Sequence, residues 1–277
     1  MNIASASKWM YAAYAVERYG ATHLLPYDIK YLTMTSGYHL LDDPCDDSQT
    51  VYDCLTYKSN DKYIPEDDGY FYYDGAHFEV HAVSGNYPIG GVARSGIRLG
   101  NDDDRDLAPE LENVLGLDLY TLGFTKPVLA EGVYTEPTSY AIFLRKILNG
   151  TLQISSLLGS HAVCTNTDRD GPYNCPTSLY TPIPEQEAWH YSLGHWVEDD
   201  PNVGDGAFSS AGAHGFYPWV WKDPLNPINA WYGMIARDVG DLSEQDAQTG
   251  LGEGWNSALC GRQIRKAWLS GTAQTSM

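Results

Sequence analysis

The chain has 277 residues, 43% of them hydrophobic, and its 36 acidic and 17 basic residues give a formal net charge of −19. This length and composition can bury a sizeable core. The negative charge disfavours nucleic acid and anionic membrane surfaces as partners. No apolar run approaches the ~20 residues that a membrane-spanning helix needs.

Cysteine spacing favours disulfides over a metal site. The five cysteines are Cys45, Cys54, Cys164, Cys175 and Cys260. The first four form two close pairs in polar loops, and neither pair has the spacing or partners of a zinc site. We therefore expect local disulfides within each pair, with the fifth cysteine a buried thiol in a C-terminal helix. Disulfides indicate an oxidising compartment, so a secreted or periplasmic protein is expected, although no signal peptide precedes Ile3.

The first predicted element is a buried helix near the start of the sequence. Ser5 and Lys8 form an S-x-x-K motif at the head of Trp9–Tyr19, whose alanine, methionine, valine and aromatic residues indicate a buried helix. Because residues three apart share a helix face, the Lys8 amine is expected beside the Ser5 hydroxyl. A serine becomes a good nucleophile when a neighbouring base takes its proton. A lysine can be that base when burial or a nearby cation lowers its pKa.

The S-x-x-K motif is weak evidence alone, because roughly one copy is expected by chance in a chain of this length. A second copy, Ser59–Lys62, lies in a polar, turn-rich stretch with no helix to hold it. The structural alternative for the first copy makes Ser5 a helix N-cap and Lys8 a solvated surface lysine. The rest of the chain favours the catalytic interpretation.

The middle of the chain is predicted to be rich in helices. Short helices are expected between Thr22 and Leu41 and within Val51–Lys58, and longer ones at Ala76–Val83, around Leu107–Leu115 and at Thr138–Leu148. Residues 86–135 are otherwise weakly periodic.

Beyond residue 186 the pattern changes to strands. Three aromatic, β-rich runs predict consecutive antiparallel strands at Ala188–Val197, Gly215–Trp221 and Ala230–Arg237, followed by a helix at Trp255–Leu269. His190 and His195 would lie on opposite sides of the first strand, so they are not expected to share a metal. The predicted fold class is mixed α/β.

Three separated motifs give the chain a resemblance to a known family. They are the S-x-x-K at Ser5, the FYYDG segment that contains Tyr73, and the AHG that ends at Gly215. In these motifs and their order the chain resembles the serine β-lactamase and penicillin-binding-protein superfamily, in particular its class C-like, esterase-like branch. The likeness covers most of the chain, although residues 86–135 match only loosely. It implies an α+β fold with an antiparallel sheet flanked by helices and a helix-rich lobe.

The resemblance also implies roles for residues on the helical side of the site. Ser5 and Lys8 match the nucleophile and its base. FYYDG looks like the family's F-x-Y-x-N segment, which makes Tyr73 the tyrosine that helps relay protons. Gly75 stands where the family often has an Asn, so a side-chain amide that would contact the substrate or Lys8 is missing.

On the sheet side, the resemblance places Ala213, His214 and Gly215 at the family's K-T-G or H-T-G motif. The backbone N–H groups of Ser5 and Phe216 would then form the oxyanion hole. Ala213 replaces the usual cation, which argues against a β-lactamase or D-Ala-D-Ala peptidase and favours a hydrolase of a small ester or amide without carboxylate recognition. No cofactor is implied.

We expect one domain over residues 1–277, with a helix-rich lobe at about 20–160, a sheet lobe at about 161–277, and the nucleophile helix 5–19 between them. The family normally places a helix and two strands before the nucleophile, whereas four residues precede Ser5 here. A truncated sequence is therefore expected, with an unpaired sheet edge and an uncovered apolar face.

Two alternatives to an active enzyme remain open. The altered third motif and the missing strands also fit a non-catalytic binding protein that kept the fold, or an inactive truncated fragment.

Overall fold

The computed structural model describes residues 1–42, 45, 48–88, 96–118, 122–168, 171–173, 175–226, 228–237 and 252–274. Its helices are η1 (Ala4–Ala6), α1 (Ser7–Tyr19), α2 (Pro26–Leu32), α3 (Val51–Leu55), η2 (Pro65–Asp67), α4 (Ala76–Val83), α5 (Asp104–Leu115), α6 (Pro137–Leu148), η3 (Gln153–Leu157) and α8 (Glu253–Ser270). Its strands are β1 (Phe71–Tyr72), β2 (Leu122–Phe124), β3 (Val133–Thr135), β4 (Val163–Cys164), β5 (Ser178–Tyr180), β6 (His190–Ser192), β7 (His195–Glu198), β8 (Ala207–Ser209), β9 (Phe216–Lys222) and β10 (Ala230–Ala236).

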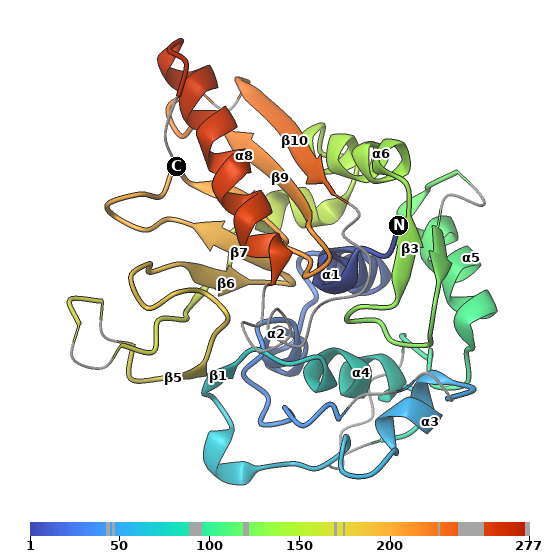
Figure 1. Ribbon diagram of the computed structural model, residues 1–277. Helices are drawn as coiled ribbons and strands as arrows, with labels where there is room; N and C mark the ends of the chain where they lie inside the picture. The colour runs from blue at the N-terminus through green and yellow to red at the C-terminus, as the bar shows by residue number, and fades with distance from the viewer. Residues whose placement is uncertain are drawn as a thin grey trace.

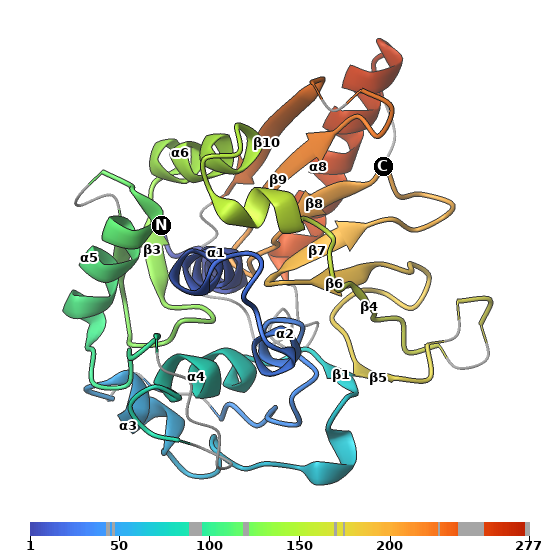
Figure 2. The same ribbon diagram turned by 180° about the vertical axis from the view of Figure 1, so that it is seen from behind.

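The main sheet is antiparallel and has the strand order β10-β9-β8-β7-β6-β4. Helix α8 crosses one face of this sheet (Figure 1), and α6 packs on β9 and β10 from the other side (Figure 2). The predicted mixed α/β fold, an antiparallel sheet flanked by helices, is confirmed. The five longest predicted helices are also present, with ends that differ by no more than three residues.

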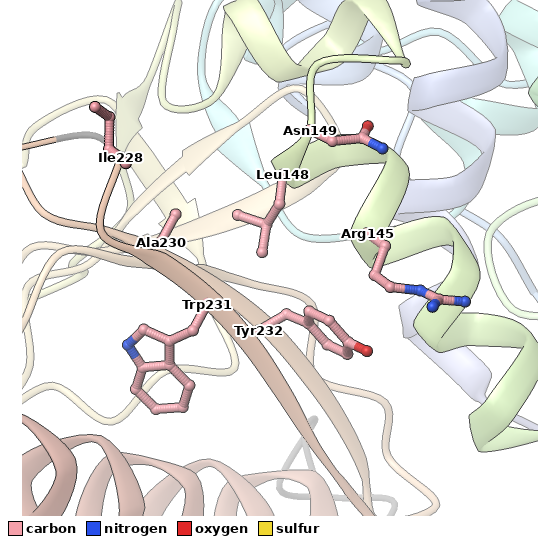
Figure 3. Close-up of a pocket in the computed structure, with 7 residues that line it drawn as sticks. All are labelled: Arg145, Leu148, Asn149, Ile228, Ala230, Trp231 and Tyr232. Atoms are coloured by element: carbon pink, nitrogen blue, oxygen red, sulfur yellow. The ribbon is translucent and has the colours of Figure 1, made fainter.

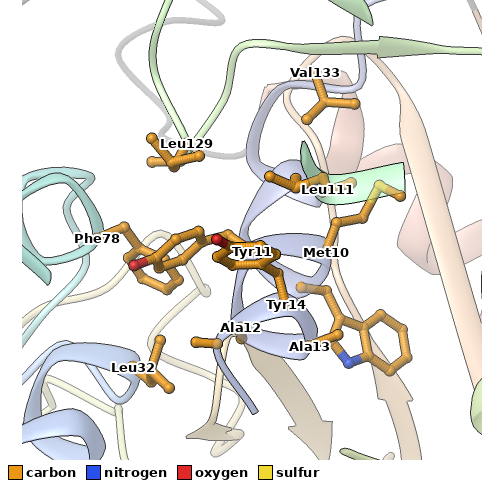
Figure 4. Close-up of a cluster of buried hydrophobic side chains, with 14 of the residues drawn as sticks. Met10, Tyr11, Ala12, Ala13, Tyr14, Leu32, Phe78, Leu111, Leu129 and Val133 are labelled. Carbon is orange, nitrogen blue, oxygen red and sulfur yellow. The ribbon is translucent and has the colours of Figure 1, made fainter. Parts of the chain in front are cut away.

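Helix α1 lies at the centre of the molecule, between the sheet and the helices α2, α4 and α5 (Figure 1). It is apolar on all sides, as expected of a helix that is buried all round, and its residues Trp9–Val16 are at most 1% exposed. Figure 4 shows side chains from several other elements packed around it, among them Phe78 of α4 and Leu111 of α5. The packing fixes the position of any group carried at the head of α1.

The segment before α1 is tied to a small second sheet. The Ile3 N–H donates to the Val133 carbonyl, and the Thr135 N–H donates to the Met1 carbonyl, so the chain start lies along β3. The β6–β7 hairpin holds the helix region from the other side, because the Gly194 N–H donates to the Leu32 carbonyl at the end of α2. The segment that leads into Ser5 is therefore anchored to β3, and the hairpin to the end of α2.

The predicted strand Ala188–Val197 is wrong, because it is a hairpin. Strands β6 and β7 pair with each other and turn at Leu193 and Gly194, with a positive φ of 71° at the glycine. His190 and His195 therefore lie on adjacent strands rather than on opposite faces of one. Each has its own partner: His190 pairs with Asp199, and His195 accepts the Gly159 N–H.

Both predicted disulfides, Cys45–Cys54 and Cys164–Cys175, are confirmed. The prediction of a buried fifth thiol is wrong, because Cys260 is exposed. Helix α8 turns its small residues and two arginines toward the sheet, namely Gly254, Ser257, Ala258, Gly261, Arg262 and Arg265. Position 260 falls on the opposite face of this helix.

Strand β10 ends the order of the described strands in the main sheet. Its own side chains are mostly half-buried, whereas Ile228 just before it and Trp268 of α8 are 90% and 70% exposed. The unpaired edge and uncovered apolar face expected of a truncated sequence stay predictions. A hollow of about 600 Å³ lies between β10 and the end of α6. Figure 3 shows residues that line it, among them Leu148, Trp231 and Tyr232. No helix among the described residues is both long enough and apolar enough to cross a membrane.

Candidate active site

Ser5 and Lys8 meet at the head of α1. Ser5 lies on η1, one turn before Lys8, and the Lys8 ammonium donates to the Ser5 Oγ across 2.9 Å. Lys8 is 3% exposed. The N-cap of α1 is Ala6 and no side chain caps it, so the structural alternative of a capping Ser5 with a solvated Lys8 does not hold. The pair has the spacing needed to exchange a proton.

The backbone that presents Ser5 is strained. Ala4 has φ 45°, in the left-handed region that residues with a side chain rarely adopt. Hydrogen bonds hold it there: its N–H donates to Asn2 Oδ1 at 2.8 Å, and its carbonyl accepts the Ser7 hydroxyl at 2.7 Å. Strain of this kind costs about 1–3 kcal/mol and concentrates at functional sites.

Tyr73 completes the helical side of the site. The Lys8 Nζ lies 5.0 Å from the centre of the Tyr73 ring. The ring stacks on Trp196 of β7, and the Tyr73 N–H donates to the Tyr180 carbonyl. The structure thus brings together the three residues that the sequence assigned to catalysis, Ser5, Lys8 and Tyr73.

A neutral histidine supports the approach to Tyr73. His77 is buried, and burial lowers its pKa to about 3. Its Nε2 donates to the Tyr72 carbonyl, which leaves Nδ1 to accept the Ser36 hydroxyl. The imidazole therefore fixes the strand that leads into Tyr73.

Lys8 has a second partner that the sequence did not indicate. Its ammonium donates to the Ala130 carbonyl across 3.0 Å. A side chain at position 75 would collide with this region, because a Cβ on Gly75 would lie 2.6 Å from Leu41 and 3.0 Å from Ala130. A side chain at position 75 would therefore require Leu41 and Ala130 to shift.

Two carboxyl groups, those of half-buried Asp74 and buried Glu79, lie close enough to Lys8 for its charge to affect their pKa values. Burial raises the pKa of Asp74, and the N–H groups of Ala76 and Leu41 together with Lys8 oppose that shift. Burial raises the pKa of Glu79 to about 8, against the opposing effects of two backbone N–H groups and Lys8.

On the sheet side, Ala213, His214 and Gly215 form a turn rather than part of a strand. Gly215 has φ 87°, and its carbonyl accepts the Arg237 N–H and the Ser257 hydroxyl of α8. The turn is therefore anchored to β10 and α8. Its first residue, Ala213, carries no charge.

Phe216 is the first residue of β9, and Tyr140 links it to the segment around Ser5. Its buried ring lies 5.0 Å from the Tyr140 ring, and the Tyr140 hydroxyl donates to the Ala6 carbonyl, next to Ser5. Strand β9 also packs on η1.

Sequence reasoning missed two residues on the sheet side. The Ser210 hydroxyl donates to the Ser5 carbonyl at 3.4 Å. Gly212 lies backbone to backbone against the entry to η1, since a Cβ there would be 2.0 Å from the Ile3 carbonyl oxygen. The sequence shows several glycines around this turn, which is a signal for a close backbone contact. Only the fold shows that Gly212 is the glycine that contacts Ile3.

No cluster of three or more His, Cys, Asp or Glu side chains able to hold a metal occurs among the described residues.

Comparison with known proteins gives the fold. No protein-family model and no curated protein matches the sequence. Among solved structures, FmtA from Staphylococcus aureus aligns with a TM-score of 0.50 and 12% identity over 93% of this chain and 74% of its own. A β-lactamase from Mycobacterium bovis shares 17% identity (TM-score 0.49; 95% of this chain, 87% of that one). A D-stereospecific amidohydrolase from a Streptomyces species shares 13% (TM-score 0.49; 91% and 86%).

At these identities the similarity concerns the fold alone. The sheet order, the flanking helices and the alignment with FmtA agree with the resemblance seen in the motifs. The chain has the fold of the serine β-lactamase and penicillin-binding-protein superfamily.

Proposed function

We propose that this protein is a serine hydrolase that acts on a small ester or amide through an acyl-enzyme on Ser5. The observation that carries the proposal is the 2.9 Å contact between the Lys8 Nζ and the Ser5 Oγ, made by a lysine that is almost completely buried. A buried lysine beside a serine hydroxyl is the arrangement that activates a serine nucleophile.

The proposed reaction has two acyl transfers. Lys8 in its neutral form takes the Ser5 proton while Oγ bonds to the acyl carbon, and the carbonyl electrons move onto oxygen. The backbone N–H groups of Ser5 and Phe216 are the proposed donors to this oxyanion. The proton then passes to the leaving alcohol or amine, with Tyr73 proposed to help the transfer. Water repeats the sequence and releases the acid.

The proposed substrate is uncharged, without the carboxylate that a cation at position 213 would bind. Ala213 supplies no charge at the position where the family carries a cation, and the neighbouring Gly215 is fixed by α8. An uncharged short-chain ester is therefore a better first substrate than a penicillin, which bears a carboxylate.

We also propose that the protein works outside the reducing cytosol. Two disulfides, Cys45–Cys54 and Cys164–Cys175, support this proposal, because such bonds persist in secreted and periplasmic proteins.

The test is turnover of a chromogenic short-chain ester by the wild-type protein, Ser5→Ala and Ser59→Ala. Ser59 is the matched control because it heads the second S-x-x-K copy. We expect turnover by the wild type and Ser59→Ala, with loss of turnover in Ser5→Ala. Equal turnover by Ser5→Ala would refute the assignment.

A further inference from the structure

Glu79 is a buried carboxylate outside the set of residues proposed to react. It lies on α4, is 0% exposed, and directs its two oxygens at consecutive backbone groups. Oε2 accepts the Leu129 N–H at 3.1 Å, and Oε1 accepts the Ala130 N–H at 2.9 Å. Burying a carboxylate is costly, and two charge-assisted hydrogen bonds to backbone N–H groups offset part of that cost.

One of the residues that Glu79 holds, Ala130, also meets the proposed base. Ala130 donates its N–H to Glu79 and accepts the Lys8 ammonium with its carbonyl, and Lys8 in turn reaches the Ser5 Oγ. A continuous series of contacts, each 2.9–3.0 Å long, therefore runs from Glu79 to the nucleophile.

The loop that carries Ala130 is closely packed as well. The Gly132 N–H donates to the Val128 carbonyl at 2.8 Å, which closes a tight turn around Ala130. Figure 4 shows Leu129 near Phe78 of α4 and Tyr11 of α1, so the loop sits between the two helices that carry Glu79 and Lys8. The Glu79 carboxylate sets the orientation of the Leu129 and Ala130 N–H groups between the two helices.

We infer that Glu79 is a positioning residue for the proposed Ser5 hydrolase: by holding the N–H groups of Leu129 and Ala130, it fixes the backbone on the N-terminal side of the Ala130 carbonyl, aims that carbonyl at Lys8 and keeps the Lys8 Nζ on Ser5. This inference rests on the proposed function. A lysine amine on its flexible four-carbon stem has several rotamers, and the fixed carbonyl selects one of them. Small displacements of a reacting group are costly, with losses of up to about a hundredfold for 1 Å.

The charge on Glu79 gives this role a signature in the pH profile. Burial raises its pKa to about 8, so both N–H bonds form fully only above that pH. Protonation below it converts one acceptor oxygen to a hydroxyl, and one of the two bonds is lost. The titratable groups that face Glu79 are Lys8 and Tyr11 of α1 and Glu131 of the loop.

Glu112 offers a matched control. It is also a buried glutamate, on α5, and its Oε1 accepts the Leu122 N–H at 2.7 Å. It holds the β2 backbone in the way that Glu79 holds the loop, but it is not one of the groups that contact Lys8 or Ser5 in the described structure.

The experiment measures the rate of Ser5 labelling by a fluorophosphonate from pH 6 to pH 10, with thermal unfolding in parallel, for the wild type, Glu79→Gln and Glu112→Gln. We expect Glu79→Gln to label about tenfold to a hundredfold more slowly and to lose the rise in rate near pH 8. Glu112→Gln should keep the wild-type rate and profile. Glu79→Gln with wild-type rates and an unchanged profile would overturn the inference.

Two further measurements keep the outcomes distinct. If Glu79→Gln does not fold, Glu79→Asp retains the charge and should keep the rise near pH 8. In the wild type, the protection factors of the residue 129 and 130 amides, which correct for the intrinsic pH dependence of exchange, should fall below pH 8. Protection factors that do not change across this range would also overturn the inference. A wild type that never labels would refute the proposed hydrolase itself, and the role of Glu79 with it.

Discussion

The central pair on the helical side of the candidate site, Ser5 and Lys8, is close together in the sequence, whereas the sheet side reaches Ser5 from more than 200 residues away. On the helical side, Lys8 lies one turn after Ser5 and meets its hydroxyl directly. On the sheet side, Ser210 and Gly212 contact the backbone around Ser5, and neither belongs to the tripeptide that the motif indicated. Local helical geometry can be predicted from spacing, but the placement of a turn against a distant segment cannot.

The largest expected effect on the labelling of Ser5 comes from replacing Lys8 on the helical side. Lys8→Met removes the base while keeping an apolar side chain in a buried position, so Ser5 labelling should fall by about 10²- to 10⁴-fold. Lys8→Arg is the control for charge alone, because an arginine cannot act as a base in proteins. Labelling rates by mass spectrometry decide the matter, and wild-type rates in Lys8→Arg would show that the amine is not the base.

The next effect concerns the sheet side. Gly212→Ala places a Cβ against the Ile3 carbonyl oxygen, a backbone atom that cannot swing away, and should cost about 3 kcal/mol or more of unfolding free energy. Gly123→Ala is the matched control, because its Cβ would have only an ordinary 3.9 Å contact with the Tyr134 carbonyl oxygen. Urea unfolding measures both, and equal stability of the two variants would contradict the close contact.

The fold and the helical side could be predicted well from the sequence for physical reasons. The all-round apolar character of α1 indicated burial, and the three-residue spacing fixed the Ser5–Lys8 pair. The carbonyl of Ala130 could not be predicted, because a backbone group has no residue-type signal. Glu79 gave no signal for the same reason, since its partners are backbone N–H groups 50 and 51 residues away.

Errors on the sheet side have local causes. The run Ala188–Val197 looked continuous because aromatic residues flank the tight turn at Gly194 on both sides. The exposure of Cys260 depends on which face of α8 meets the sheet, and the small residues of that helix decide this. Neither feature can be predicted without knowledge of the tertiary packing.

Acid should destabilise both sides together. Burial lowers the pKa of His77 on the helical side to about 3 and that of His195 on the sheet side to about 4. The unfolded chain then binds more protons than the folded one, so the stability contributed by each neutral imidazole is present above about pH 6.5 and is lost as the pH falls toward 3–4.

Each buried histidine should contribute on the order of 2–4 kcal/mol of this loss. His77→Gln and His195→Gln should each flatten the decline in unfolding free energy between pH 6.5 and pH 4. His190→Gln should not flatten it, because the hydrogen bond that His190 donates to the Asp199 carboxylate raises the pKa of His190. An unchanged slope in both buried-site variants would contradict the neutral state assigned to them.

The smallest expected effect is that of Ser210→Ala. Its hydroxyl bond to the Ser5 carbonyl is long, at 3.4 Å, so its loss should cost about 0.5 kcal/mol and change ester turnover by less than about threefold. Steady-state kinetics measure this change. A drop as large as that of Lys8→Met would mean that the sheet side takes a direct part in the chemistry.

The most direct measurement is the intact mass of the protein after treatment with a fluorophosphonate, followed by peptide mapping. The Ser5–Lys8 contact predicts a single adduct on Ser5, unchanged in Ser59→Ala and absent from Ser5→Ala. An unmodified wild type, or an adduct that persists in Ser5→Ala, would contradict a nucleophile activated at the head of α1.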